Sequence, residues 1–160
     1  MRRIAMLAGT AAVALFASTT SAQAKAVNFA GKWVVVDSTT LGRGGRGGFG
    51  QTATLIQDAG TLTVVRAGPN GETKTIYKLD GSESKNSVMM RGASIAESAK
   101  AMWMSDTLMV ATSRMVNGAT VGSVIHLYID ASGNLVVATT APGRGGGPEV
   151  TTKVVYKKGT

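Results

Sequence analysis

The sequence predicts an all-β domain that folds as an antiparallel up-and-down β-barrel of eight to ten strands. After the first 24 residues, the chain is a series of short runs rich in β-branched residues, and helical periodicity is almost absent. The turns between these runs are too short for crossover connections, so runs that are neighbours in sequence should pair antiparallel. Closure into a barrel removes the two exposed edges of such a sheet. A β-sandwich is the alternative architecture.

The expected strands are, in order, residues 28–38, 51–57, 61–67, 72–79, 86–91, 95–104, 106–116, 119–130, 134–141 and 149–157. The turns between them include Asp58-Ala59-Gly60, Asp80-Gly81-Ser82 and Asn117-Gly118, whose residues tolerate the backbone angles of tight hairpins. Only residues 93–101 have a helical turn as an alternative, because Ala, Glu, Ser and Lys give little support to a strand there.

Alternation of side chains assigns the faces of some strands. In the first run, Phe29, Gly31 and Trp33 fall on one side, and we expect Trp33 to point inward as the floor of the barrel. The run 119–130 has apolar residues on both sides, so its inward face is ambiguous. We expect His126 and Tyr128 to point inward.

The first 24 residues are expected to be a cleaved signal peptide. Arg2 and Arg3 precede an apolar stretch of small and aliphatic residues, and Ala22-Gln23-Ala24 is an A-x-A cleavage pattern. Residues 25–160 then form a single secreted or periplasmic domain. Loss of Arg2 and Arg3 lowers the formal net charge from +8 to +6, so the mature domain stays basic.

Composition excludes several classes of site and partner. The chain has no Cys and a single His, so disulfide frameworks, thiolate metal sites and His-based metal sites are not expected, and neither is a cofactor. No apolar run of about 18 residues follows the N-terminal segment, so the domain is not expected to span a membrane. With 5% aromatic residues, the chain lacks stacking platforms for nucleic acid. The sequence does not indicate an oligomeric state.

Motifs for catalysis are also missing. Neither a G-x-S-x-G elbow nor a P-loop occurs, so we do not expect an enzyme. The segment Asp80-Gly81-Ser82-Glu83 could be interpreted as a calcium loop, but it lacks the spaced carboxylates of such loops, and a hairpin turn is the better interpretation.

The segment Asn28-Phe29-Ala30-Gly31-Lys32-Trp33 resembles the F-x-G-x-W opening of lipocalins and fatty-acid-binding proteins, the calycin group of barrels. The ten-run meander and the closing segment 151–158 are similar to fatty-acid-binding proteins in particular. The resemblance implies a barrel with a cavity for a small molecule. It also extends to uncharacterised secreted bacterial proteins that share this opening, the hairpin of residues 77–81 and a terminal V-Y-K-K.

The chain departs from fatty-acid-binding proteins at two places. Those proteins have a helical lid between the first two strands, whereas the Gly-rich segment 39–50 cannot form a helix. They also read a ligand carboxylate with an Arg two positions before the last-strand Tyr, and the matching residue is Val154. The resemblance therefore does not carry that carboxylate site over.

Two Gly-Arg loops supply the candidate site for a head group. Segments 41–49 and 142–148 follow the first strand and precede the last, and these connections share one rim in an even-stranded barrel. Arg43, Arg46 and Arg144 would then form a basic rim that attracts an anion. The alternative interpretation is two solvated, flexible loops.

The candidate apolar contacts are Tyr77, Trp103 and Tyr128, with His126 as a polar contact. Beyond Met1 and Met6, the methionines are confined to neighbouring strands, where they could form an adaptable apolar wall or ordinary core packing; they are Met89, Met90, Met102, Met104, Met109 and Met115. Met89 and Met90 must point to opposite faces, so at least one lies outside any cavity.

These observations favour a barrel that binds a small apolar or amphipathic anionic ligand. The alternative, from a different functional class, is a non-catalytic structural or interaction module of the cell envelope with a packed interior. Interior volume discriminates between the two: a cavity of roughly 300 Å³ or more supports the binding barrel.

Overall fold

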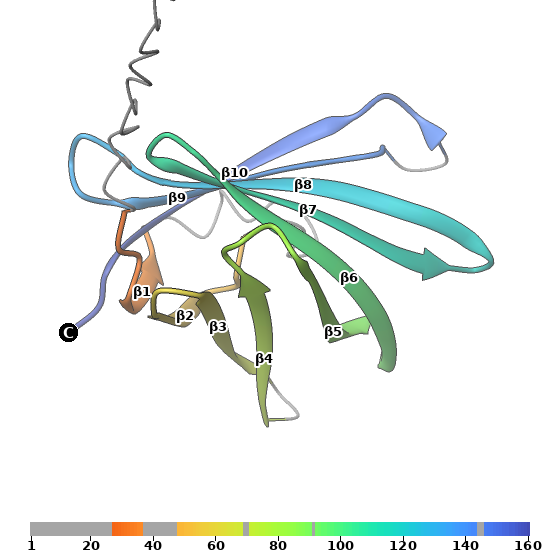
Figure 1. The fold of residues 1–160 in the computed structure, drawn as a ribbon, viewed down its shortest axis with the longest axis horizontal. Coiled ribbons are helices and arrows are strands. Elements are labelled where there is room, and N and C mark those ends of the chain that lie inside the picture. Colours follow the sequence, from red (N-terminus) through yellow and green to blue (C-terminus); the bar gives the residue numbers. More distant parts are fainter. Residues whose placement is uncertain (1–26, 37–47, 69–70, 91, 144–145) are drawn as a thin grey trace, which may run out of the picture.

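The computed structural model describes residues 27–36, 48–68, 71–90, 92–143 and 146–160. Within them, ten antiparallel strands form one sheet that curls into a nearly closed barrel (Figure 1), as the sequence predicts. The strands are β1 (Gly31–Val35), β2 (Thr52–Gln57), β3 (Thr61–Gly68), β4 (Gly71–Lys78), β5 (Glu83–Met90), β6 (Ala93–Met104), β7 (Thr107–Val116), β8 (Ala119–Ile129), β9 (Leu135–Ala141) and β10 (Val150–Lys158). The helical alternative for residues 93–101 is wrong, since these residues belong to the long strand β6.

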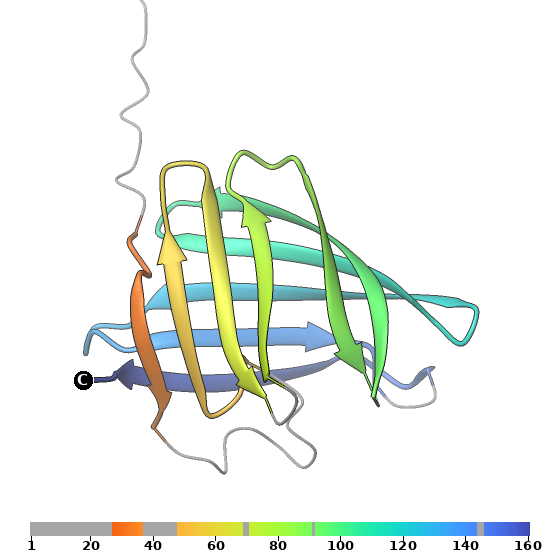
Figure 2. The ribbon, with the colours of Figure 1, turned by 90° about the horizontal axis from the view of Figure 1, so that it is seen from below.

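The first and last strands are neighbours in the sheet. β1 pairs with β10, with Trp33 opposite Lys158 and Val35 opposite Tyr156, and the two ends of the sheet are β4 and β5. Strands β1–β4 run across strands β7–β10 (Figure 2), and the β7–β8 hairpin projects beyond the other strands. The two halves of the sheet therefore face each other across the core.

Trp33 is fixed in the core by packing and by a hydrogen bond. It is 1% exposed, and its indole Nε1–H donates to the carbonyl oxygen of Phe29 at 2.8 Å. The Phe29 ring stacks on Trp103 of β6, with ring centroids 5.7 Å apart, so the N-terminal segment is joined to the opposite half of the barrel. The expectation that Trp33 points inward is confirmed.

Backbone angles explain why glycine occupies position 31 and why Asn117-Gly118 forms a turn. Gly31, the glycine of the F-x-G-x-W segment, has a φ of +138°, which side chains with a Cβ rarely adopt. A Cβ at Gly31 would meet Lys158 Cε at 3.6 Å, an ordinary contact, so backbone conformation rather than space requires glycine. Asn117 and Gly118, with φ values of +52° and +79°, form the two-residue turn expected between β7 and β8.

The register of β8 corrects the expected orientation of two residues. Leu127 is fully buried and lies opposite two other fully buried residues, Leu108 on β7 and Val137 on β9. Since side chains alternate along a strand, His126 and Tyr128 lie on the outer face, and the expectation that they point inward is wrong.

A seam between β4 and β5 is closed by side chains instead of a backbone ladder. Within the described residues these strands share no ladder pairing, although a short turn joins them. The Asn86 side chain accepts a hydrogen bond from the Ile76 N–H at 2.8 Å and donates one to the Ile76 carbonyl at 3.0 Å. Ser84 Oγ accepts a hydrogen bond from the Lys78 N–H at 2.9 Å. Asn86 thus substitutes for a paired strand residue.

Replacing Asn86 with alanine is expected to loosen this seam. Both hydrogen bonds to Ile76 disappear, and because the site is exposed we expect a loss of about 1 kcal/mol of unfolding free energy. Amide hydrogen exchange should accelerate at Ile76 and remain unchanged at Val64 in β3. Lys85→Ala, a change at an exposed neighbour, is the control. Unchanged exchange at Ile76 in Asn86→Ala would show that Asn86 does not hold the seam.

Candidate functional site

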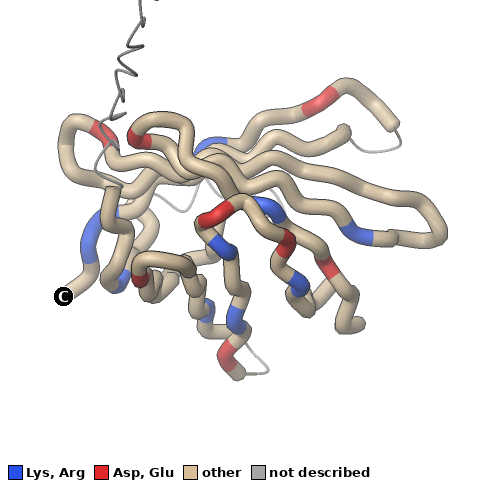
Figure 3. The backbone as a smooth tube through the Cα atoms, viewed as in Figure 1, with Lys and Arg blue, Asp and Glu red and all other residues tan. Residues whose placement is uncertain are grey.

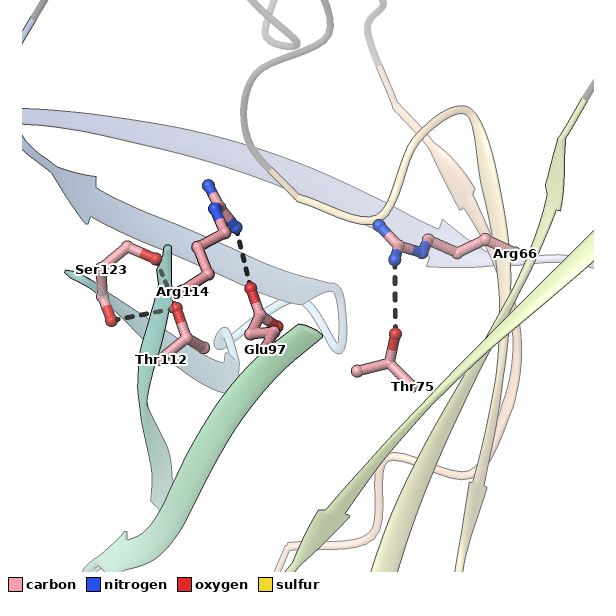
Figure 4. A network of polar contacts seen from close by, with 6 residues as sticks. All are labelled: Arg66, Thr75, Glu97, Thr112, Arg114 and Ser123. Carbon is pink, nitrogen blue, oxygen red and sulfur yellow. Dashed lines mark hydrogen bonds and ion pairs between the residues drawn. The ribbon is translucent and has the colours of Figure 1, made fainter. Parts of the chain in front are cut away.

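The inward-facing side chains include a polar cluster in addition to the apolar core. The core contains Phe29, Trp33, Leu55, Leu62 and Leu108, each 1% exposed or less. The interior polar cluster consists of six residues from strands β3, β4, β6, β7 and β8; they are Arg66, Thr75, Glu97, Thr112, Arg114 and Ser123 (Figure 4). A polar cluster inside a barrel costs desolvation energy unless its groups find partners.

Glu97 and Arg114 form an ion pair between neighbouring strands. They are cross-strand partners on β6 and β7, and Arg114 Nη1 donates to Glu97 Oε2 at 2.8 Å. Glu97 is 6% exposed and the Arg114 side chain is 26% exposed. Such a partly desolvated, hydrogen-bonded pair holds the carboxylate in place. The carboxylate of Glu97 therefore neutralises mainly the guanidinium of Arg114.

Arg66 approaches the cluster from the opposite half of the barrel. Its guanidinium is turned toward the Glu97–Arg114 pair (Figure 4), and Nη2 donates to Thr75 Oγ1 at 3.3 Å. The Nε atoms of Arg66 and Arg114 are both buried, and neither has a hydrogen-bond acceptor among the described residues. A buried donor on a charged group is costly to leave without an acceptor.

Two hydroxyl groups complete the cluster on the side of Arg114. Thr112 Oγ1 lies 2.7 Å from Ser123 Oγ, and the two residues are cross-strand partners on β7 and β8. Hydroxyl groups both donate and accept hydrogen bonds, so this pair can serve either a protein group or a bound polar group.

The charges of the interior polar cluster affect the pKa values of two tyrosines, Tyr77 and Tyr156. Burial raises the pKa of Tyr77 strongly, the negative charge of Glu97 raises it further, and Arg66 opposes both effects. Burial also raises the pKa of Tyr156, while a hydrogen bond from the Phe49 N–H at 2.6 Å and the charge of Arg66 act in the opposite direction. Both phenols therefore stay neutral at physiological pH and share the interior with Arg66.

Of the site residues expected from the sequence, some lie inside the barrel and others lie on its outer face or outside the described residues. Tyr77 is buried near Arg66 and Glu97, and Trp103 packs against the core while stacking on Phe29. His126 and Tyr128 lie on the outer face, as described above. The rim residues Arg43, Arg46 and Arg144 lie outside the described residues, as does the expected signal peptide of residues 1–24.

Four of the six methionines lie outside the interior, so the methionines do not form an interior wall. Met89, Met102, Met104 and Met115 are each about half exposed on the outer face of strands β5–β7. The physical reason is alternation, because Ala101 and other small or apolar neighbours take the inward positions.

Two adjoining hollows lie on the outer face of strands β5–β7, with volumes of about 270 and 400 Å³. Most of the lining residues occupy outward positions, such as Lys100 and Ala111 in the first hollow, Met115 and Thr120 in the second, and Ser113 in both. The lining of the second hollow also includes Glu97 and Arg114 of the interior polar cluster. Both hollows therefore open on the outer face, and the second extends to the Glu97–Arg114 pair.

Arg66, Glu97 and Arg114 are the residues that sequence reasoning missed. Their signal is present in the sequence, since Arg66 falls on the same face of its strand as the buried Leu62 and Val64, and Arg114 on the same face as the buried Leu108 and Val110. A charged residue on the face of a strand whose other side chains are buried indicates an interior polar site.

The described strands carry both basic and acidic side chains, and they hold no cluster of the side chains that commonly bind metal ions. Lys, Arg, Asp and Glu are interspersed (Figure 3). Among the described residues, no three His, Cys, Asp or Glu side chains are close enough to hold a metal ion. In the same part of the chain, no helix has both the length and the apolar character needed to cross a membrane.

No protein-family model matches the chain, and no curated protein sequence is significantly similar to it. The fold and the interior polar cluster are thus the basis for any functional assignment.

Proposed function

We propose that this protein is a binding barrel for a small amphipathic anion, whose charged group is held by Arg66 and Arg114 inside the barrel. The observation that carries the proposal is a charge imbalance in the interior polar cluster. Two guanidinium groups face one carboxylate, and that carboxylate is hydrogen-bonded to Arg114. An additional anion between Arg66 and Arg114 would balance the charge and accept hydrogen bonds from the buried Nε–H groups.

The position of the seam supports a route to this site. Asn86 is the cross-strand partner of Glu97, and Ile76, to which Asn86 is hydrogen-bonded, follows Thr75 directly in β4. Side-chain hydrogen bonds are easier to open than a continuous backbone ladder, because fewer bonds must break together. A ligand could therefore reach the polar cluster through the seam, with its apolar part along Tyr77.

The sequence also suggests where the protein is located and which barrels it is related to. We propose that the domain is secreted or periplasmic, that it is related to the calycin barrels, and that the rim residues Arg43, Arg46 and Arg144 attract the anion toward the barrel. The A-x-A pattern of Ala22-Gln23-Ala24 behind an apolar stretch supports export, and N-terminal sequencing of the protein from its host is expected to begin at Lys25. Retention of Met1 in a cytoplasmic protein would contradict it.

Arg66→Met tests the binding proposal directly. Methionine preserves much of the side-chain volume while removing the guanidinium, so we expect dodecanoate to bind at least tenfold more weakly and dodecanol to bind as before. Tryptophan fluorescence titration reports binding because Trp103 packs against the core. Lys74→Met removes the same charge from an exposed position on β4 and should change dodecanoate affinity less than twofold.

Two outcomes would contradict the binding proposal. If Arg66→Met and Lys74→Met weaken dodecanoate binding equally, the affinity depends on net charge alone and not on a site at Arg66. No binding of dodecanoate or dodecyl phosphate by the unaltered protein would favour a second function, a packed interaction module of the cell envelope. The specific observation in favour of that second function is the position of both hollows on the outer face of the barrel.

A further inference from the structure

Three methionines occupy neighbouring positions on the outer face of the barrel, beside the β6–β7 turn. Met102 and Met104 are two residues apart on β6, and Met109 on β7 is the cross-strand partner of Met102. Ala101 and Leu108, which precede Met102 and Met109, are fully buried, so alternation turns all three methionines outward. We call Met102, Met104 and Met109 the thioether triad.

The thioether triad is not explained by core packing. Met102 and Met104 are 47% and 54% exposed. Long apolar side chains in such positions gain little from burial, and other outward positions of the same strands carry Lys100, Ala111 and Ser113. What the three side chains share is a soft, polarizable sulfur donor on a flexible chain.

The strand register brings the three sulfurs within reach of one point. Directly opposite residues have Cβ atoms about 4.5–5.5 Å apart, and diagonal neighbours such as Met104 and Met109 are separated by about 7–8 Å. A point midway along that diagonal is about 4 Å from each of the three Cβ atoms. A methionine sulfur lies two bonds beyond Cβ, and a metal–sulfur bond of about 2.3 Å covers the remaining distance.

The hairpin that carries the thioether triad is firmly placed. Trp103, between Met102 and Met104, points inward, packs against the core and stacks on Phe29 with an interplanar angle of 11°. A short turn joins β6 to β7 next to Met104. A site whose donors stand on paired strands keeps its geometry better than one on loops.

We propose that the thioether triad binds one Cu(I) ion through its three sulfurs. Thioether and thiolate ligands select soft ions such as Cu(I), whereas carboxylate-rich and carbonyl-rich sites select Mg²⁺ and Ca²⁺. His126 lies on the far side of Met109, about 9.5 Å or two strand spacings from Met102, so the site is assigned to sulfur alone. This site is separate from the interior polar cluster and does not depend on the binding proposal.

The test is an anaerobic Cu(I) titration in competition with bicinchoninate. The unaltered protein is expected to take up one Cu(I) per chain. The triple variant Met102→Leu, Met104→Leu and Met109→Leu preserves volume but removes the sulfurs, and should bind at least tenfold more weakly. The double variant Met89→Leu and Met115→Leu changes two equally exposed methionines elsewhere on β5 and β7 and should bind within twofold of the unaltered protein.

Histidine supplies the remaining control. His126→Ala should leave Cu(I) affinity unchanged, because the three sulfurs supply the ligands and His126 lies beyond Met109. Equal affinity of the triple variant and the unaltered protein would overturn the proposal. An equal loss in the Met89/Met115 variant or in His126→Ala would overturn the assignment to the thioether triad.

Discussion

Replacing Trp33 with alanine is expected to lower the free energy of unfolding by about 3–5 kcal/mol, the range for large-to-small changes in a core. Trp33 is 1% exposed and its indole donates to the Phe29 carbonyl, so the variant loses packing and leaves a buried acceptor without its donor. The cation–π contact of the Lys158 ammonium, 5.6 Å from the ring centroid, is lost as well. Urea denaturation followed by circular dichroism measures the change.

Ile56→Ala is the control for this measurement. Ile56 lies on β2 and is 57% exposed, so its truncation should cost less than about 0.5 kcal/mol. Unfolding free energies for Trp33→Ala and the unaltered protein that agree within error would contradict the role of Trp33 as a core residue of the barrel.

Glu97→Gln is expected to have opposite effects on stability and on anion affinity. Removing one partner of a buried ion pair costs about 3–5 kcal/mol, and because Arg114 is partly exposed we expect a smaller loss of about 2–3 kcal/mol. The same change leaves two guanidinium groups without a carboxylate, so dodecanoate should bind more tightly. Added dodecanoate should then recover more stability in Glu97→Gln than in the unaltered protein, because a ligand that binds the folded state stabilises it.

Thermal unfolding with and without dodecanoate measures both effects of Glu97→Gln. Glu83→Gln is the matched control, since Glu83 is exposed on the outer face and accepts a hydrogen bond from Ser98 at 2.6 Å. It should change neither the stability gained from dodecanoate nor the affinity. A loss of dodecanoate affinity in Glu97→Gln would show that Glu97, and not the pair of arginines, organises the site.

Local signals predicted most of the fold. Turn residues such as Asn117 and Gly118 fixed the hairpins, and alternation around Trp33 identified the buried face of β1. The need to remove sheet edges predicted that the first and last strands pair, and the pairing of β1 with β10 confirms this, although the barrel is only nearly closed because β4 and β5 form no ladder in the described residues. These features depend on residues close in sequence or on a property of any sheet, so no long-range information was needed.

The orientation of β8 could not be predicted because both of its faces are largely apolar. Ile125 and Leu127 compete with His126 and Tyr128 for the interior, and propensity does not separate them. The register with β7, which places Leu127 opposite Leu108, decides the question, and register is a long-range property.

The candidate site was harder to predict than the fold. Its charged residues come from β3, β6 and β7, and only the folded barrel brings Arg66 toward the Glu97–Arg114 pair. The Gly-Arg loops form a local sequence signal because their arginines are close in sequence, whereas the interior arginines are single residues in apolar strands. Reading each strand for a charged residue on its buried period would have found them.

The most direct test of an anion site between Arg66 and Arg114 is an NMR titration of the arginine Nε–H groups with dodecanoate, with dodecanol as the uncharged reference. Arg66 and Arg114 have buried Nε atoms, so their signals should be separate from those of exposed arginines. We expect both signals to shift together, to saturate at one dodecanoate per chain and not to respond to dodecanol. Saturable binding of dodecanoate that leaves both signals unchanged, or the absence of any binding, would contradict an anion site between Arg66 and Arg114.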